Sequence, residues 1–367
     1  MLLSYKRIWC VLLVPIAGLL SLLARYNPAL TDKLYSQGLY PVLTGSIGRL
    51  TALVPFSLAE MLLLGGVIGV LIWLGMAITA IVKQKNKRRA LVARLLATVV
   101  CIGSLWYFLF VFLCGLNYSR LSFAEHSGLF VRPSAPEELA ALCGELVATV
   151  NDLRPRLPVD EQGRAISAFA NPYVQADFAS GLYDNLGADY PFLQGFTPPP
   201  KPVQISRFMS RVNIVGIFVP FTYECNVNTD VAPYNIPSSM AHELAHFKGF
   251  MREDEANYIA WLACRASGND EFAYSGAMLA LTHASNALAA ADREAYRTVM
   301  EQVSPGVWLD WAQNNAYWKQ FEGTVSEVST AVNDTYLRAN RQADGVKSYG
   351  RMVDYLLADY RQRHGLV

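Results

Sequence analysis

The sequence predicts a mainly α-helical membrane protein with three transmembrane helices near the amino terminus and a predominantly helical domain after them. Three apolar runs, 8–24, 61–82 and 95–116, occupy the first third of the chain. Hydrophobic residues make up 53% of the chain and charged residues 17%, against about 25% charged residues in a typical soluble domain. Part of the chain is therefore expected not to face water.

The charge balance excludes two classes of protein. The 367 residues include 31 Lys and Arg against 30 Asp and Glu, for a net charge of +1. A disordered chain would be poor in apolar residues, and a nucleic-acid binder would carry a strongly basic face. We therefore expect no nucleic-acid partner, and we expect the lipid bilayer as a partner.

The two longer runs, 61–82 and 95–116, carry no charged residue. At a rise of 1.5 Å per residue, each crosses a hydrocarbon core of about 30 Å. The run 8–24 is near the lower length limit, and Lys6 and Arg7 before it also fit a cleaved signal peptide. Because no pair of small residues follows at a cleavage spacing, we predict a retained signal anchor. Two spans after a cleaved signal are the alternative.

Basic residues predict the orientation of the spans. Lys6 and Arg7 precede the first run, and the densest basic cluster, 83–89, joins the second and third runs. Because loops rich in Lys and Arg stay in the cytoplasm, the amino terminus is predicted to be cytoplasmic. The sequence therefore divides into a membrane domain, 1–117, and an extracytoplasmic domain, 118–367.

The outer part is expected to be helical with a small β element. A capping pattern at Ser134 opens an amphipathic helix, and 238–363 is predicted to consist of helices separated by short breaks. The one strong strand signal is 212–228, which Gly216 and Pro220 interrupt. Since proline cannot occupy a central strand, this segment is predicted to be an edge strand or a bent hairpin.

The segment 238–249 contains the motif H-E-x-x-H. On a helix, His242 and His246 lie one turn apart, about 40° around the axis, so both imidazoles can reach one metal ion. Glu243 is then placed to accept a proton from a metal-bound water. Zinc is the ion that this pattern predicts. A serine at 238 or 239 is expected to cap the helix, and Gly249 to end it.

A catalytic zinc site needs a third protein ligand. If 252–264 forms a helix, Glu253 falls within its buried apolar stripe and Glu255 at the border of that stripe. A carboxylate on a buried face needs a cation or a hydrogen-bond network. Glu253 is therefore the predicted third ligand and Glu255 the alternative. Asn257, one turn further on, is predicted to support a ligand through a hydrogen bond.

Three further residues are candidates for binding substrate or stabilising a transition state. The strand that ends near Tyr223 precedes the metal helix, where an edge strand can pair with an extended peptide. Tyr349 and His283 are candidates for stabilising an oxyanion. For each, a packed aromatic side chain or a core histidine is the favoured alternative.

The six cysteines match no metal or redox motif. Cys10, Cys101 and Cys114 fall in the apolar runs, and three lie outside them: Cys143, Cys225 and Cys264. One disulfide among these outer three is one interpretation. Small buried apolar side chains are the favoured one.

Four segments follow the spans in a fixed order: 220–228, HELAH at 242–246, EDEAN at 253–257 and 344–351. In this order they resemble a bacterial membrane family called domain of unknown function thirty-eight-ten. The likeness covers nearly the whole chain, and the HELAH to EDEAN block is its most specific part. The E-x-x-x-N spacing also resembles the glutamate-ligand zincins.

The resemblance implies a zincin-like metallopeptidase in the bacterial cell membrane, with matching residues at His242, Glu243, His246 and Glu253. The sequence therefore leads us to expect a membrane-anchored zinc enzyme that hydrolyses peptide or protein substrates outside the cytoplasm. The alternative is a non-catalytic membrane sensor or scaffold with a structural or vestigial zinc site.

Overall fold

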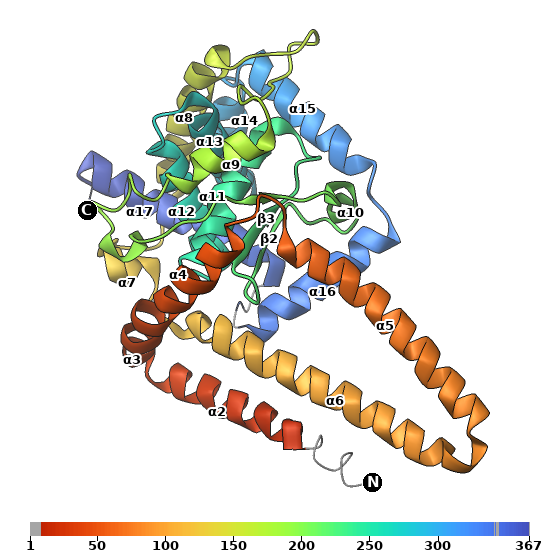
Figure 1. The fold of residues 1–367 in the computed structure, drawn as a ribbon. Helices are drawn as coiled ribbons and strands as arrows, with labels where there is room; N and C mark the ends of the chain where they lie inside the picture. The colour runs from red at the N-terminus through yellow and green to blue at the C-terminus, as the bar shows by residue number, and fades with distance from the viewer. Residues whose placement is uncertain (1–8, 341, 343–344, 367) are drawn as a thin grey trace.

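A computed structural model describes residues 9–340, 342 and 345–366. It is mainly helical, with 72% helix and 3% strand, which confirms the predicted fold class. Three long helices extend from a helical body that holds a small sheet (Figure 1).

Three helical segments are long and apolar enough to cross a membrane: Trp9–Tyr26, Leu58–Lys83 and Lys85–Leu113. They correspond to η1 (Trp9–Leu12) with α2 (Leu13–Tyr26), α5 (Leu58–Lys83), and η3 (Lys85–Lys87) with α6 (Arg88–Leu113). The helices α5 and α6 meet at η3 and diverge toward the body (Figure 1). The three predicted spans are thus confirmed as candidate transmembrane helices.

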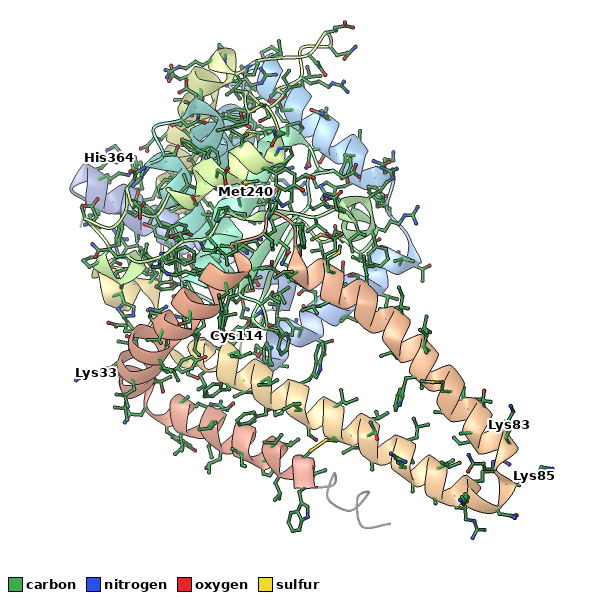
Figure 2. All side chains as sticks on the ribbon, viewed as in Figure 1. Lys33, Lys83, Lys85, Cys114, Met240 and His364 are labelled. Atoms are coloured by element: carbon green, nitrogen blue, oxygen red, sulfur yellow. A yellow bond between two sulfur atoms is a disulfide. The ribbon has the colours of Figure 1, made fainter. Side chains whose placement is uncertain are left out.

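The cysteines fall into two groups. A disulfide joins Cys10 in η1 to Cys101 in α6 (Figure 2). The others are free and buried: Cys114, Cys143, Cys225 and Cys264. The favoured interpretation of the outer three cysteines is therefore confirmed, and the structure holds no disulfide among them.

The segment between the first two spans is helical and belongs to the body. It consists of α3 (Pro28–Thr31), the π-helix η2 (Asp32–Leu39) and α4 (Tyr40–Thr51). The Tyr40 hydroxyl donates to the backbone carbonyl of His246 at 3.2 Å, and Gly48 lies against the ring of Phe247. The body is therefore built from residues on both sides of the predicted boundary at residue 117.

The helices of the body after the third span are α7 (Phe123–Ser127), α8 (Pro136–Leu153), α9 (Pro172–Ser180), α10 (Ser206–Arg211), α11 (Ile236–Phe247), α12 (Glu253–Arg265), α13 (Asp270–Ala291), α14 (Arg293–Met300), α15 (Pro305–Lys319), α16 (Thr324–Ala339) and α17 (Met352–His364). Short 3-10 turns connect them: η4 (Gly115–Ser119), η5 (Arg154–Arg156), η6 (Pro191–Leu193), η7 (Pro233–Asn235) and η8 (Gly345–Arg351). The core forms where α13 packs against α8 and α12, and α12 against α11.

The sheet has three short strands in the order β1 (Lys201–Pro202), β3 (Glu224–Val227), β2 (Gly216–Val219). The strands β2 and β3 form an antiparallel hairpin, and β1 pairs with β3 in parallel. Pro220 lies in the hairpin turn, where its missing N–H costs no ladder hydrogen bond. The predicted bent hairpin is therefore confirmed, and β2 is its edge strand.

The sheet also fixes the start of α5. The Glu224 carboxylate of β3 accepts hydrogen bonds from the backbone N–H groups of Leu58, at 3.0 Å, and Ala59, at 2.7 Å. A carboxylate is favourable there because the first N–H groups of a helix are unpaired and carry partial positive charge. The second span is thus attached directly to the strand beside α11.

Candidate metal centre

The helix α11 carries the H-E-x-x-H motif and begins earlier than predicted. It starts at Ile236, with Pro237 in its first turn. The hydroxyls of Ser238 and Ser239 donate to the backbone carbonyl of Asn235, at 3.2 Å and 2.7 Å, so the predicted serine cap is wrong. Proline is well suited to the first turn because its missing N–H would have no intrahelical partner.

A tight turn joins α11 to α12, as predicted. The helix α11 ends at Phe247, and Gly249 adopts φ +89°, a conformation that glycine accepts most readily. The next helix begins at Glu253. This turn folds the start of α12 back onto the two histidines.

Three candidate metal-ligand side chains meet between the two helices. The Nε2 atom of His242 lies 3.1 Å from Oε2 of Glu253, and Nε2 of His246 lies 3.6 Å from the same oxygen. All three ligand atoms lie within 4.8 Å of one another. Zinc bonds of about 2.0–2.1 Å in tetrahedral geometry place ligand atoms roughly 3.3 Å apart. The spacing therefore fits one zinc ion.

Each histidine ring is oriented by a partner at its other nitrogen. Nδ1 of His242 lies 2.7 Å from Oδ1 of Asn257, and Nδ1 of His246 lies 2.7 Å from the carbonyl oxygen of Phe250. Both oxygens are acceptors, so each Nδ1 carries the hydrogen and each Nε2 is directed at Glu253, as a metal ligand would require. Asn257 thus occupies the supporting position that its helical spacing predicted.

Two buried oxygens support the fit to a cation. Oε2 of Glu243 has no hydrogen-bond partner among the described residues, and Oε2 of Glu253 faces the two histidine Nε2 atoms. Burial alone would raise the pKa of Glu253, but His246 and His242 outweigh it and hold that pKa at about 2. The charge of Glu253 in turn overcomes the burial of His246 and raises its pKa to about 9. A metal ion bound at the two Nε2 atoms would displace this proton.

Glu243 lies beside the cluster, against the edge strand β2. A Cβ added to Gly216 would lie 2.4 Å from its Oε1, and the backbone N–H of Phe218 donates to its carboxylate. Burial raises the pKa of Glu243. A buried carboxylate with a raised pKa is suited to accept a proton near neutral pH.

The alternative ligand Glu255 lies away from the cluster. Its carboxylate accepts two hydrogen bonds from Arg252, at 2.9 Å and 2.7 Å, and one from the backbone N–H of Phe123 at 2.7 Å. Through these hydrogen bonds, Glu255 connects α12 to the start of α7. Glu253 is therefore the carboxylate that the fold brings to the histidines.

The weaker candidates differ in position. His283 of α13 is half-buried, and burial together with the nearby His242 lowers its pKa to about 4. Tyr223 is fully buried, and its hydroxyl donates to the carbonyl of Leu113 at 2.8 Å, so it joins the hairpin to α6. The side chain of Tyr349 lies outside the described part of the structure.

Two tyrosines near the cluster were not predicted. The hydroxyls of Tyr118 in η4 and Tyr336 in α16 lie 3.1 Å apart. Burial raises the pKa of both, and the negative charge of Glu253 raises each further. Because η4 and α16 meet only in the folded chain, no local sequence pattern could have found this pair.

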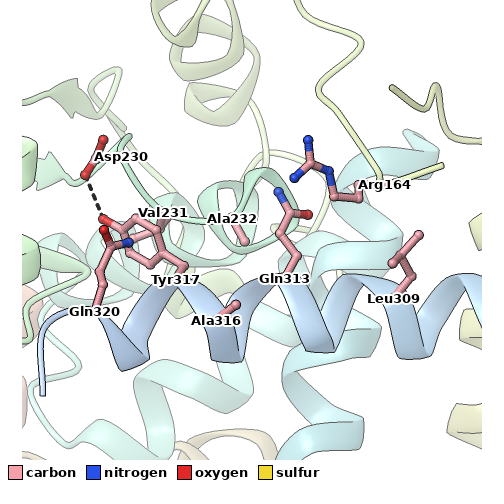
Figure 3. Close-up of a pocket in the computed structure, with 9 residues that line it drawn as sticks. All are labelled: Arg164, Asp230, Val231, Ala232, Leu309, Gln313, Ala316, Tyr317 and Gln320. Atoms are coloured by element: carbon pink, nitrogen blue, oxygen red, sulfur yellow. Dashed lines mark hydrogen bonds between the residues drawn. The ribbon is translucent and has the colours of Figure 1, made fainter. Parts of the chain in front are cut away.

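A surface pocket lies elsewhere, along α15 (Figure 3). It is lined by Arg164, Asp230, Val231, Ala232, Leu309, Gln313, Ala316, Tyr317 and Gln320. Within it, the Tyr317 hydroxyl donates to Asp230 at 2.8 Å (Figure 3). None of these residues belongs to the histidine and glutamate cluster, so the pocket is a separate feature.

The fold and the cluster define a class: a helical protein with three candidate membrane spans and an H-E-x-x-H cluster on a buried helix. The family model for Protein of unknown function (DUF3810) matches residues 35–357. Because this match covers most of the chain, the protein belongs to that family, as the sequence resemblance predicted. No curated protein and no solved structure matches the chain.

Proposed function

We propose that this protein is a membrane-anchored zinc metallopeptidase whose helical body lies outside the cytoplasm. The observation that carries the proposal is the convergence of His242, His246 and Glu253 within 4.8 Å, with Glu243 next to them. The buried oxygen of Glu243 that has no partner among the described residues supports it, as does the Glu253 oxygen that faces both histidine nitrogens, because a bound cation and its water would satisfy both.

In this proposal His242, His246 and Glu253 hold the zinc. Bound zinc polarises a peptide carbonyl and lowers the pKa of a coordinated water. Glu243 would accept a proton from the attacking water and pass it to the leaving amine. The Tyr118 and Tyr336 hydroxyls are donors on the Glu253 side that can stabilise developing negative charge.

The edge strand β2 is the proposed place for the substrate backbone. Among the described strands its only partner is β3, and Ile217 at its centre is 45% exposed. An extended peptide can add to such an edge through main-chain hydrogen bonds. That mode of binding places a peptide bond near Glu243, which touches the same strand.

Replacing Glu243 by Gln tests the proposal. The variant is expected to hold zinc in the same ratio as the wild type but to hydrolyse peptides about 10²- to 10⁴-fold more slowly, since it lacks the general base. Metal analysis and mass spectrometry of a peptide library measure the two properties.

Full activity in the zinc-loaded Glu243→Gln variant would contradict the proposed base. Zinc-loaded wild type that cleaves nothing, together with complementation of a deletion strain by Glu243→Gln, would favour the sensor or scaffold instead.

A further inference from the structure

The helix α16 carries an exposed apolar stripe. Val325 is 64% exposed, Val328 58%, Val332 64% and Tyr336 42%. Their spacings of three, four and four residues place all four within an arc of about 80° around the helix axis. A continuous apolar stripe facing outward is unusual for a surface helix in water.

Another side of α16 packs on the body, where Leu337 is fully buried. Asp334 and Arg338 form a partly exposed ion pair at 2.6 Å on the polar side of the helix. The Ser329 hydroxyl donates to the carbonyl of Val212 at 2.5 Å. The orientation of α16 is thus fixed by the body. Val325, Val328 and Val332 are directed away from the body, and Tyr336 lies at the contact with η4 and α6.

Two aromatic contacts place this side of the body beside the third span. The Tyr336 ring of α16 packs on Phe110 in the last turn of α6, with ring centroids 6.1 Å apart. Phe221, in the turn between β2 and β3, packs on Trp106 of α6 at 4.9 Å. Figure 1 shows α16 on the side of the body from which α5 and α6 extend.

The depth of these contacts in the membrane can be estimated from their positions along α6. Arg94 is the last charged residue of α6, and the stretch from 95 to 113 rises about 28 Å, close to the roughly 30 Å hydrocarbon core. Phe110 then lies about 5 Å, and Trp106 about 10 Å, inside the far boundary. Interfacial helices bury their apolar faces about 5–10 Å deep.

The stripe is also close to the metal cluster. Tyr336 ends the stripe, and its hydroxyl bonds to that of Tyr118. Gln342, just after α16, accepts a hydrogen bond from the backbone N–H of Glu253 at 3.1 Å. The end of α16 that touches the span is therefore the end nearest Glu253.

We propose that α16 lies in the membrane surface beside α6, with Val325, Val328 and Val332 among the lipid acyl chains and Tyr336 at the contact with α6. The metal site then lies next to the bilayer, and its substrates are polypeptide segments held at the membrane surface, such as the juxtamembrane part of a membrane-anchored protein. This second part rests on the proposed peptidase function.

The lipid contact is tested by nitroxide labels on the full-length protein in phosphatidylethanolamine and phosphatidylglycerol vesicles. Val328→Cys and Val332→Cys are compared with Glu327→Cys, which lies on the polar side of the same helix. Because the described free thiols are buried, labelled wild type gives the background. Labels at 328 and 332 are expected to be more accessible to oxygen than to a water-soluble nickel complex, and the label at 327 to show the reverse.

Preferential access of the nickel complex at 328 and 332 would overturn the membrane contact, because the stripe would then face water. Low access of both reagents would also overturn it, since protein would then cover the stripe. Neither result depends on peptidase activity.

The substrate class is tested with one peptide in two forms, free and attached to a lipid anchor in the same vesicles. Val328→Asp is expected to reduce cleavage of the anchored peptide about tenfold and to leave cleavage of the free peptide unchanged. Ser326→Asp, which adds a carboxylate away from the stripe, should change neither.

Equal effects of Val328→Asp on both peptides, or no effect on either, would contradict the surface-substrate proposal. If the zinc-loaded wild type cleaves neither form, the peptidase function and this substrate class fail together. The label measurements would still decide whether α16 contacts lipid.

Discussion

Gly216 determines where the Glu243 carboxylate can lie. A Cβ at this position would come within 2.4 Å of Oε1 and 2.8 Å of Cγ of Glu243. Those distances are far below ordinary contact, and the backbone of β2 is held by pairing to β3. An alanine at 216 would therefore push the carboxylate out of its present position beside the cluster.

We predict that Gly216→Ala lowers the kcat for peptide hydrolysis about 10²-fold, because a shift of about 1 Å in a catalytic group has that cost. Zinc content should be unchanged, since the three atoms nearest to a Cβ at 216 all belong to Glu243, which is not a predicted ligand. Gly144→Ala is the control, because nothing lies within 4 Å of a Cβ there. Wild-type kcat in Gly216→Ala would show that the Glu243 carboxylate is not the base.

At the scale of residues, the spacing of side chains along the sequence predicted most of the histidine and glutamate cluster. The i, i+4 spacing predicted the pair His242 and His246, and the buried stripe of α12 favoured Glu253 over Glu255. The carbonyl of Phe250 was not predicted, because it reaches His246 only through the positive φ of Gly249. The sequence shows a glycine there but not the direction of the next carbonyl.

Among the contacts between elements, the one made by Asp32 attaches η2 to the helices of the body. Its carboxylate in η2 lies 3.3 Å from Nε of Arg120 and 3.1 Å from Nε2 of His126, and both carboxylate and guanidinium are almost fully buried. Arg120 also donates to the carbonyl of Lys248 and lies over the ring of Phe250. This ion pair therefore supports the turn that orients His246.

We predict that Asp32→Asn lowers the free energy of unfolding by about 3–5 kcal/mol, because it leaves the buried Arg120 charge without a partner. Asp152→Asn is the control. Its pair with Arg156 is exposed, so its loss should cost less than about 1 kcal/mol. Thermal unfolding in detergent measures both, and equal effects would contradict a structural role for Asp32.

The stability that Asp32 contributes is expected to depend on pH. Burial would raise the pKa of Asp32, but the hydrogen bond from His126 and the charge of Arg120 lower it below its usual 3.8. A carboxyl with a depressed folded-state pKa contributes stability above its unfolded pKa and loses it as the pH falls through the folded value. The stability difference between wild type and Asp32→Asn should therefore shrink below about pH 4.

Elements that carry a strong hydrophobic periodicity or a long apolar run were predicted well. The spans and the bent hairpin follow from run length and from Pro220. The packing of η2 and α4 onto the body was not predicted, because a polar segment between two spans resembles a plain loop. Its contacts, such as Tyr40 with the His246 carbonyl, join residues 206 positions apart.

At the scale of the whole molecule, the basic cluster and the body lie at opposite ends of the α5 and α6 hairpin. Figure 2 shows Lys83 and Lys85 at the tip of the hairpin, away from the body. If basic loops stay in the cytoplasm, the body and its metal cluster lie on the other side of the membrane.

Labelling of single cysteines with a membrane-impermeant maleimide tests this orientation. We predict that Glu161→Cys, exposed on the body, reacts in intact spheroplasts, and that Lys87→Cys, exposed in the hairpin turn, reacts only after permeabilisation. The wild type corrects for native thiols. The reverse pattern would place the cluster in the cytoplasm and exclude an extracytoplasmic peptidase.

The zinc site itself is tested most directly by X-ray absorption at the zinc edge on the purified full-length protein, together with metal analysis. We predict one zinc per chain with two histidine nitrogens and one carboxylate oxygen at about 2.0–2.2 Å. Glu253→Gln should lose most of the zinc. Glu255→Gln, which alters the contacts with Arg252, Phe123 and Tyr355 away from the histidines, should keep it. Zinc-free wild type, or zinc bound by cysteine sulfur, would contradict the account.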